Sequence, residues 1–133
     1  MKKSKLLNLF RRTLLNNDDY DAESKNQIID YSPNENNLIL STHRALCEAI
    51  PHNVRGIICR YDKGILSWKV YFDGPYTEDE KDILSTACTE VFSDFVDYIE
   101  HVNEQYIELP YPSKMEYAPI KEWAFKRFEG LSE

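Results

Sequence analysis

Residues 77 to 95 carry the pattern of an amphipathic helix, which is stable only when its apolar side covers another surface. Thr77 and Glu80 have the spacing of a capping box, and acidic residues in the first turn favour the positive end of the helix dipole. The pattern predicts a helix with one apolar stripe, formed by Ile83, Leu84, Ala87, Cys88, Val91, Phe92 and Phe95.

Two runs rich in β-branched and aromatic residues, 54 to 61 and 65 to 73, precede this helix. Asp62-Lys63-Gly64 between them supplies a turn whose glycine can adopt a positive φ, so the two runs predict a β-hairpin. In the second run, apolar residues alternate with Ser67, Lys69, Tyr71 and Asp73. We therefore expect one dry face of the sheet and one wet face.

The segments on either side of the hairpin and helix complete the expected fold. Ser32-Pro33-Asn34-Glu35 has the order of an N-cap, a first-turn proline and a capping glutamate, and predicts a helix that ends before Pro51. Residues 98 to 109 predict one or two strands, and residues 120 to 128 predict a final strand. We expect an α+β fold of order ααββαββ, with an antiparallel sheet of about four strands and helices packed mainly on one face.

The first 31 residues differ in character from the rest of the chain. Leu6, Phe10 and Leu14 recur at helical spacing, and residues 1 to 16 hold five basic residues and no acid. We expect a basic N-terminal helix and polar connector over residues 1 to 31, and a single domain over residues 32 to 133. No run has the length and apolarity of a membrane span or a signal core, so we expect a cytoplasmic protein.

The net charge of −7 is concentrated in one part of the chain. Residues 77 to 109 hold ten acidic residues and a single base, Lys81, which gives this segment a net charge of −9. Such a surface repels nucleic acid and attracts basic proteins. We therefore expect a basic protein as the partner, and no nucleic acid.

Nine tyrosines are the second unusual feature of the composition. Several lie in or beside expected turns, where a tyrosine can present a rigid apolar ring with a polar tip to a partner. Ordinary packing at the sheet edge accounts for others. The expected partner-binding residues are Asp73, Tyr76, Glu78, Asp79, Asp82, Tyr98, Glu100, Glu104, Tyr106 and Tyr111.

Glu90 and Asp94 lie one helical turn apart beside the apolar stripe. General acid–base enzymes use two carboxylates in contrasting environments, so this pair is the best candidate for a catalytic dyad. No base or nucleophile accompanies it, however, and Arg55 or Arg60 of the hairpin could neutralise it. We therefore interpret these four residues as a structural ion pair between helix and hairpin, and expect no catalytic residue.

The sequence predicts neither a metal site nor a cofactor site. His43, His52 and His101 are far apart, no two cysteines have the spacing of a zinc site, and the isolated glycines form no phosphate-binding loop. The three cysteines have apolar neighbours and are interpreted as reduced core thiols: Cys47, Cys59 and Cys88.

Four short motifs span approximately residues 46 to 129. They are Arg55-Gly56-Ile57-Ile58, Phe72-Asp73-Gly74, Thr89-Glu90-Val91 with Asp94-Phe95, and Trp123-Ala124-Phe125-Lys126-Arg127. Together they resemble a family of small bacterial immunity proteins that accompany polymorphic toxins, including those of contact-dependent growth inhibition systems. The resemblance implies a cytoplasmic protein without chemistry of its own, which binds and blocks the toxin domain of its own system.

The charge pattern agrees with this resemblance. Many such toxins are nucleases, which need a basic groove for phosphate, so we expect a basic nuclease toxin as the cognate partner. One alternative is a small carboxylate-dependent enzyme that uses Glu90 and Asp94. Another is a peripheral assembly protein that uses residues 3 to 15. Packing of that helix on the domain or in a homodimer is favoured over membrane binding.

Overall fold

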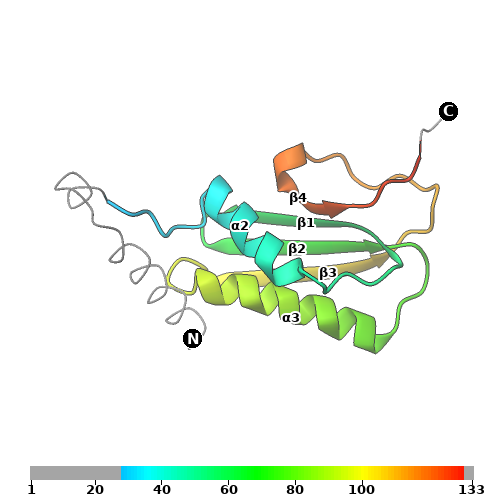
Figure 1. The fold of residues 1–133 in the computed structure, drawn as a ribbon, viewed down its shortest axis with the longest axis horizontal. Helices are drawn as coiled ribbons and strands as arrows, with labels where there is room; N and C mark the ends of the chain where they lie inside the picture. The colour runs from blue at the N-terminus through cyan, green and yellow to red at the C-terminus, as the bar shows by residue number, and fades with distance from the viewer. Residues whose placement is uncertain (1–27, 131–133) are drawn as a thin grey trace.

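Two helices lie against one face of a four-stranded sheet in the computed structural model, which describes residues 28 to 130 (Figure 1). The expected N-terminal helix lies outside the described residues. In chain order the elements are α2 (Glu35–Leu46), β1 (Val54–Asp62), β2 (Ile65–Phe72), α3 (Glu78–Asp94), β3 (His101–Glu108), the short 3-10 helix η2 (Ile120–Glu122) and β4 (Trp123–Lys126).

The strand order is β3-β2-β1-β4, and the sheet is mixed. β1 is antiparallel to both β2 and β4, whereas β3 is parallel to β2. The α+β class, the four strands and the element order are confirmed over the described residues, but the expectation of a wholly antiparallel sheet is wrong at the β2–β3 pair. The reason is that α3 crosses the sheet between these strands, so that β3 begins beside the start of β2.

The β1–β2 hairpin forms where the sequence predicts it. Asp62 pairs with Ile65, and the two turn residues between them, Lys63 and Gly64, have φ values of 48° and 86°. Two successive positive φ values match the right-handed twist of the flanking strands. The turn therefore sets the register of the hairpin, which places the alternate apolar residues of β2 on one face.

The main core lies between this face and the two helices. Leu66, Trp68, Val70 and Phe72 of β2 are completely buried. Five residues of the expected helical stripe are also buried, namely Leu84, Ala87, Cys88, Val91 and Phe95. Ile83, which was expected on the stripe, is 45% exposed because it lies on the side of α3 that faces solvent.

Both helix starts are capped, and one of the two caps differs from the expectation. In α3 the expected box is confirmed, since Thr77 Oγ1 accepts from Glu80 N and Glu80 Oε1 accepts from Thr77 N. In α2 the N-cap is Asn34, whose side chain accepts from Asn37 N at 2.8 Å. The expected cap at Ser32 is wrong, because its amide instead donates to Asp30 in a local turn.

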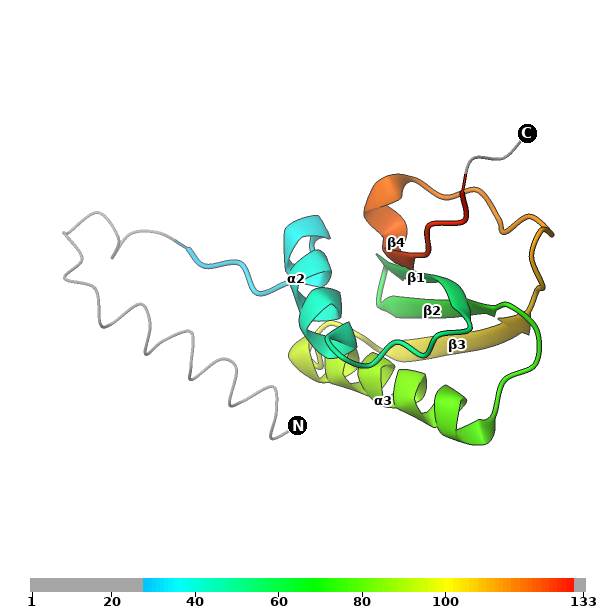
Figure 2. The ribbon, with the colours of Figure 1, turned by 45° about the vertical axis from the view of Figure 1, so that its right-hand side comes forward.

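The opposite face of the sheet is only partly wet. Tyr71 was expected on the wet face, but it is 5% exposed and forms a second small core with Ile58 and Ala118. The segment after β3, which Figure 2 shows turning back toward β4, supplies the cover. Trp123 packs closely over Gly56, where an added Cβ would lie 2.6 Å from the indole.

Candidate functional site

Exposed carboxylates gather on α3, on β3 and in the connection between them. No salt bridge joins any of them to another residue of the part of the chain that the structure describes. We call this set the acidic edge, and it consists of Glu78, Asp79, Asp82, Asp97, Glu100, Glu104 and Glu108. Five of these carboxylates are among the expected partner-binding residues, whereas Asp97 and Glu108 are additions.

Two of the four expected tyrosines are half-buried, and the other two are exposed. Tyr76 stacks on Phe72 with ring centroids 4.2 Å apart, and both Tyr76 and Tyr106 are half-buried. Tyr106 Oη donates to Glu104 at 2.6 Å, and burial together with this acceptor raises the pKa of Tyr106. Tyr98 is 42% exposed beside the acidic edge. Tyr76 and Tyr106 therefore mainly close the core beneath the edge, and Tyr98 is the more accessible ring.

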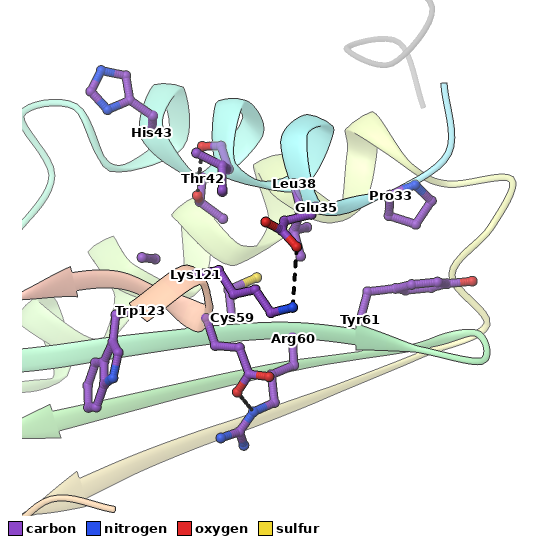
Figure 3. Close-up of a pocket in the computed structure, with 13 residues that line it drawn as sticks. Pro33, Glu35, Leu38, Thr42, His43, Cys59, Arg60, Tyr61, Lys121 and Trp123 are labelled. Atoms are coloured by element: carbon purple, nitrogen blue, oxygen red, sulfur yellow. Dashed lines mark hydrogen bonds and ion pairs between the residues drawn. The ribbon is translucent and has the colours of Figure 1, made fainter. Parts of the chain in front are cut away.

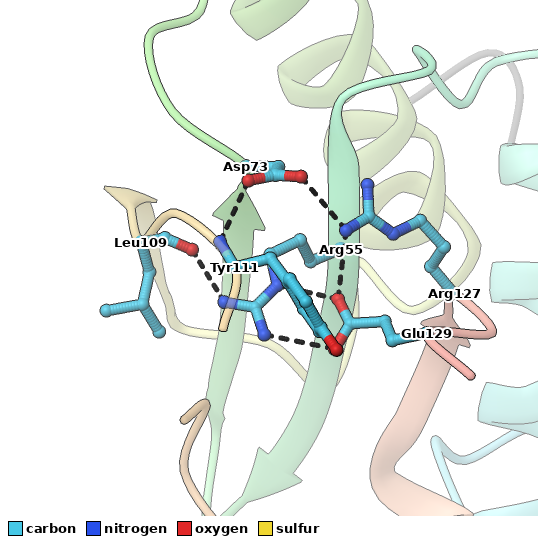
Figure 4. A network of polar contacts seen from close by, with 6 residues as sticks. All are labelled: Arg55, Asp73, Leu109, Tyr111, Arg127 and Glu129. Atoms are coloured by element: carbon cyan, nitrogen blue, oxygen red, sulfur yellow. Dashed lines mark hydrogen bonds and ion pairs between the residues drawn. The ribbon is translucent and has the colours of Figure 1, made fainter. Parts of the chain in front are cut away.

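Asp73 and Tyr111, two further expected contact residues, belong to an internal polar network (Figure 4). Tyr111 N donates to one oxygen of Asp73 at 2.8 Å, and Arg127 donates to the other at 3.0 Å. These two contacts hold the pKa of Asp73 below its usual value. Asp73 and Tyr111 therefore stabilise this network, although Tyr111 remains 49% exposed.

Arg55 is the centre of this network and is almost completely buried. Its guanidinium donates to both carboxylate oxygens of Glu129, at 2.6 and 3.0 Å, and to Leu109 O at 2.6 Å. The Arg55 contact lowers the pKa of Glu129, so the carboxylate stays charged and the buried cation stays neutralised.

The expected ion pair between hairpin and α3 is wrong for Arg55, Arg60 and Asp94. Arg60 binds Glu122 at 2.6 Å and Glu116 at 2.7 Å. Asp94 instead faces α2, where Ser41 Oγ and Arg44 Nη2 donate to it at 2.6 and 3.3 Å. Val54 and Cys59 point toward the helices, so the arginine that follows each of them points to the opposite face and cannot reach α3.

Glu116 was not singled out from the sequence, yet it organises the polar part of the opposite sheet face. Its carboxylate accepts from Lys69, Arg60 and Tyr71 Oη. The ammonium of Lys69 and the guanidinium of Arg60 lower the pKa of Glu116 to about 2. The residue lies in a proline-rich connection whose path has no periodic signal, so its position near β2 could not be predicted.

A groove between α2 and the sheet was also not expected (Figure 3). It has a volume of about 320 Å³, and its floor combines Leu38 of α2 with Cys59 of β1 and Ala124 of β4. Lys121 and Glu35 form an ion pair of 3.3 Å across it. Burial raises the pKa of the Cys59 thiol to about 12, so the thiol is not a nucleophile at neutral pH.

The remaining chemical candidates are few in the described part of the chain. Residues 28 to 130 contain no group of three or more histidine, cysteine or acidic side chains placed to hold a metal ion. Cys59 and Cys88 are buried free thiols, as expected, whereas Cys47 is exposed at the end of α2 and is not a core residue. Within the same range, no helix is long and apolar enough to cross a membrane.

The described part of the chain is therefore a small α+β scaffold with a set of exposed carboxylates, the acidic edge. A family model described as MafI2 immunity protein matches residues 35 to 129, and the chain therefore belongs to the MafI2 immunity protein family. This match confirms the resemblance to bacterial immunity proteins of polymorphic toxin systems. Members of such families are generally not enzymes. A comparison with curated protein sequences found no match.

Proposed function

We propose that this chain neutralises a cognate toxin by binding it through the acidic edge. Membership of an immunity protein family supports toxin neutralisation. We choose the acidic edge as the binding surface because its seven exposed carboxylates have no salt bridge within the described residues. A basic partner would relieve the repulsion among these like charges, which favours association.

The cognate toxin would then present a basic surface, and a nuclease is the toxin class that fits best. A nuclease holds its phosphate substrate in a positively charged groove, and the acidic edge would compete for that groove. Inhibition of this kind requires binding alone, so no catalytic residue is needed in this chain. A toxin that acts on nucleic acid would be met in the cytoplasm, where we place the inhibitor.

The experiment compares two variants that lose the same number of negative charges. The probe is the C-terminal domain of the protein encoded directly upstream of this gene, purified in an inactivated form. Asp82→Asn combined with Glu108→Gln should slow association roughly tenfold at low salt, because both carboxylates belong to the acidic edge. Glu35→Gln combined with Glu48→Gln removes exposed acids at the start of α2 and just after its end, and should change the rate less than about twofold.

Two results would contradict the proposal. Equal slowing by both double variants would mean that net charge matters and the acidic edge does not. Absence of binding by the unmodified chain, together with failure to protect cells that produce the toxin, would remove the neutralising function for that toxin.

A further inference from the structure

β3 lies at one side of the sheet, and within residues 28 to 130 it has a strand neighbour on one side only. It pairs with β2 over eight registered residues, from His101 to Glu108, without a register shift. Among the described residues, every strand pairing of β3 is made with β2. The other side of β3 is therefore a long, regular strand edge.

The hydrogen bonds to β2 show which backbone groups point outward. Leu109 N donates to Phe72 O at 2.8 Å, and His101 N donates to Gly64 O at 3.2 Å. In a parallel pair, alternate residues direct their backbone groups to the neighbouring strand, so the odd-numbered residues of β3 face β2. The outward groups consequently belong to Val102, Glu104, Tyr106 and Glu108, and Tyr76 Oη donates at 3.4 Å to the outward carbonyl of Tyr106.

Strand edges of soluble proteins are normally protected against pairing with other chains. The usual protections are a short strand, a bulge, a proline or a lysine on the edge. β4, at the other side of the sheet, is four residues long, follows directly on η2 and carries Lys126. β3 has twice that length and none of these protections. In the described part of the chain, the obstacles to pairing are its acidic side chains and the Tyr76 hydroxyl, which a new strand would have to displace from the Tyr106 carbonyl.

The charges around β3 decide which strand can pair with it. Glu104 and Glu108 are exposed on β3 and Glu100 precedes it, whereas Lys81 of α3 is the base that contacts Tyr106. A second copy of β3 would bring like carboxylates close together, which is unfavourable. A strand that carries lysine and arginine would instead gain ion pairs in addition to backbone hydrogen bonds.

We propose that an extended basic segment of the toxin adds to the sheet along the outer edge of β3, as a fifth strand. This inference rests on the proposed function and specifies how the acidic edge is used. Backbone hydrogen bonds would give the complex its register, and the carboxylates of β3 would select a basic strand over other strands.

Amide hydrogen exchange, followed residue by residue by NMR, tests the pairing in the full-length chain. In the free chain the inward amides of Asn103, Gln105 and Ile107 should be protected, while the outward amides of Glu104 and Glu108 exchange rapidly. Addition of the inactivated toxin domain should slow exchange of the outward amides at least about tenfold, because they become hydrogen-bonded.

A pair of substitutions at one position separates backbone pairing from charge. Glu104→Pro removes the outward amide and the carboxylate, whereas Glu104→Gln removes the charge alone. An outward-facing proline is compatible with an edge strand, so both variants should fold. We expect Glu104→Pro to bind the toxin domain at least about tenfold more weakly than Glu104→Gln.

The outcomes distinguish this inference from the proposed function. If the unmodified chain binds the toxin domain while the outward amides remain unprotected, strand addition is wrong and the proposed function stands. Outward amides that are already protected in the free chain would also overturn it, since another part of the chain or a second copy would then occupy the edge. If Glu104→Pro does not fold, the exchange pattern of the unmodified chain decides alone.

Discussion

At the scale of single residues, the buried Arg55 depends on specific hydrogen-bond partners. A buried guanidinium is tolerated only while its hydrogen-bond partners are in place, and Glu129 provides two of its three described hydrogen bonds. The cost of breaking this contact therefore differs from the stability that the intact contact contributes. Loss of the carboxylate leaves an unpaired cation in the interior, which costs more than the ion pair contributes by itself.

Replacement of Glu129 by alanine should lower the free energy of unfolding by about 3 kcal/mol. Urea denaturation followed by circular dichroism measures this loss. Glu100→Ala is the matched control, because Glu100 is an exposed acid without a salt bridge to a described residue, and it should change stability by less than about 0.5 kcal/mol. Similar losses in the two variants would show that the Arg55 contact does not stabilise the fold.

Glu116 should make stability depend on pH in acid. Its pKa is lowered from 4.5 to about 2, mainly by the contacts with Lys69 and Arg60. A carboxylate with a depressed folded-state pKa stabilises the fold above its unfolded pKa, and this contribution is lost as pH falls from about 4.5 to about 2. Glu116→Gln should be about 1 to 2 kcal/mol less stable at pH 7 and should show a weaker decline over this window. Parallel stability curves for the two proteins would contradict this assignment.

At the scale of elements, α3 depends on its first turn. The reciprocal hydrogen bonds of Thr77 and Glu80 satisfy two amides that would otherwise lack partners. Thr77→Ala should therefore cost about 1 kcal/mol in thermal or urea unfolding. Thr89→Ala, in the middle of the same helix, should be neutral or slightly stabilising, because alanine has the higher helix propensity. Comparable losses at both positions would mean that the cap contributes nothing.

The elements that could be predicted are those with local signals. The box at Thr77, the turn at Lys63-Gly64 and the dry face of β2 each depend on residues a few positions apart, and the structure confirms all three. The wet face of β2 was predicted wrongly at Tyr71, because a distant segment covers it. The parallel pairing of β3 could not be predicted in the same way. It depends on the path of α3 across the sheet, which local patterns do not specify.

The partners of the charged residues were the least predictable feature. Glu116, Glu122 and Glu129 are separated from their arginine partners by 56, 62 and 74 residues. They follow the break at Pro110-Tyr111-Pro112, so their positions depend on the folded path of that connection. Charge counts did indicate the acidic edge, because exposure of a dense run of acids requires no specific partner.

At the scale of the whole molecule, the uneven charge should control how fast the toxin binds. The association rate with the inactivated toxin domain should fall about tenfold as ionic strength rises from about 0.01 to 0.15 M, while the dissociation rate changes little. Stopped-flow fluorescence at several salt concentrations measures both rates. An association rate that is independent of salt would contradict electrostatic steering.

The second small core, around Ile58, Tyr71 and Ala118, lies on the face of the sheet away from the helices. Segments that close such satellite cores can detach briefly while the rest of a protein stays folded. Detachment of residues 113 to 123 would uncover this cluster, yet β2, α3 and β3 would remain packed through the main core. Ile107 of β3 packs against this cluster, so a fluctuation on that face would reach the strand that we propose holds the toxin through this side chain.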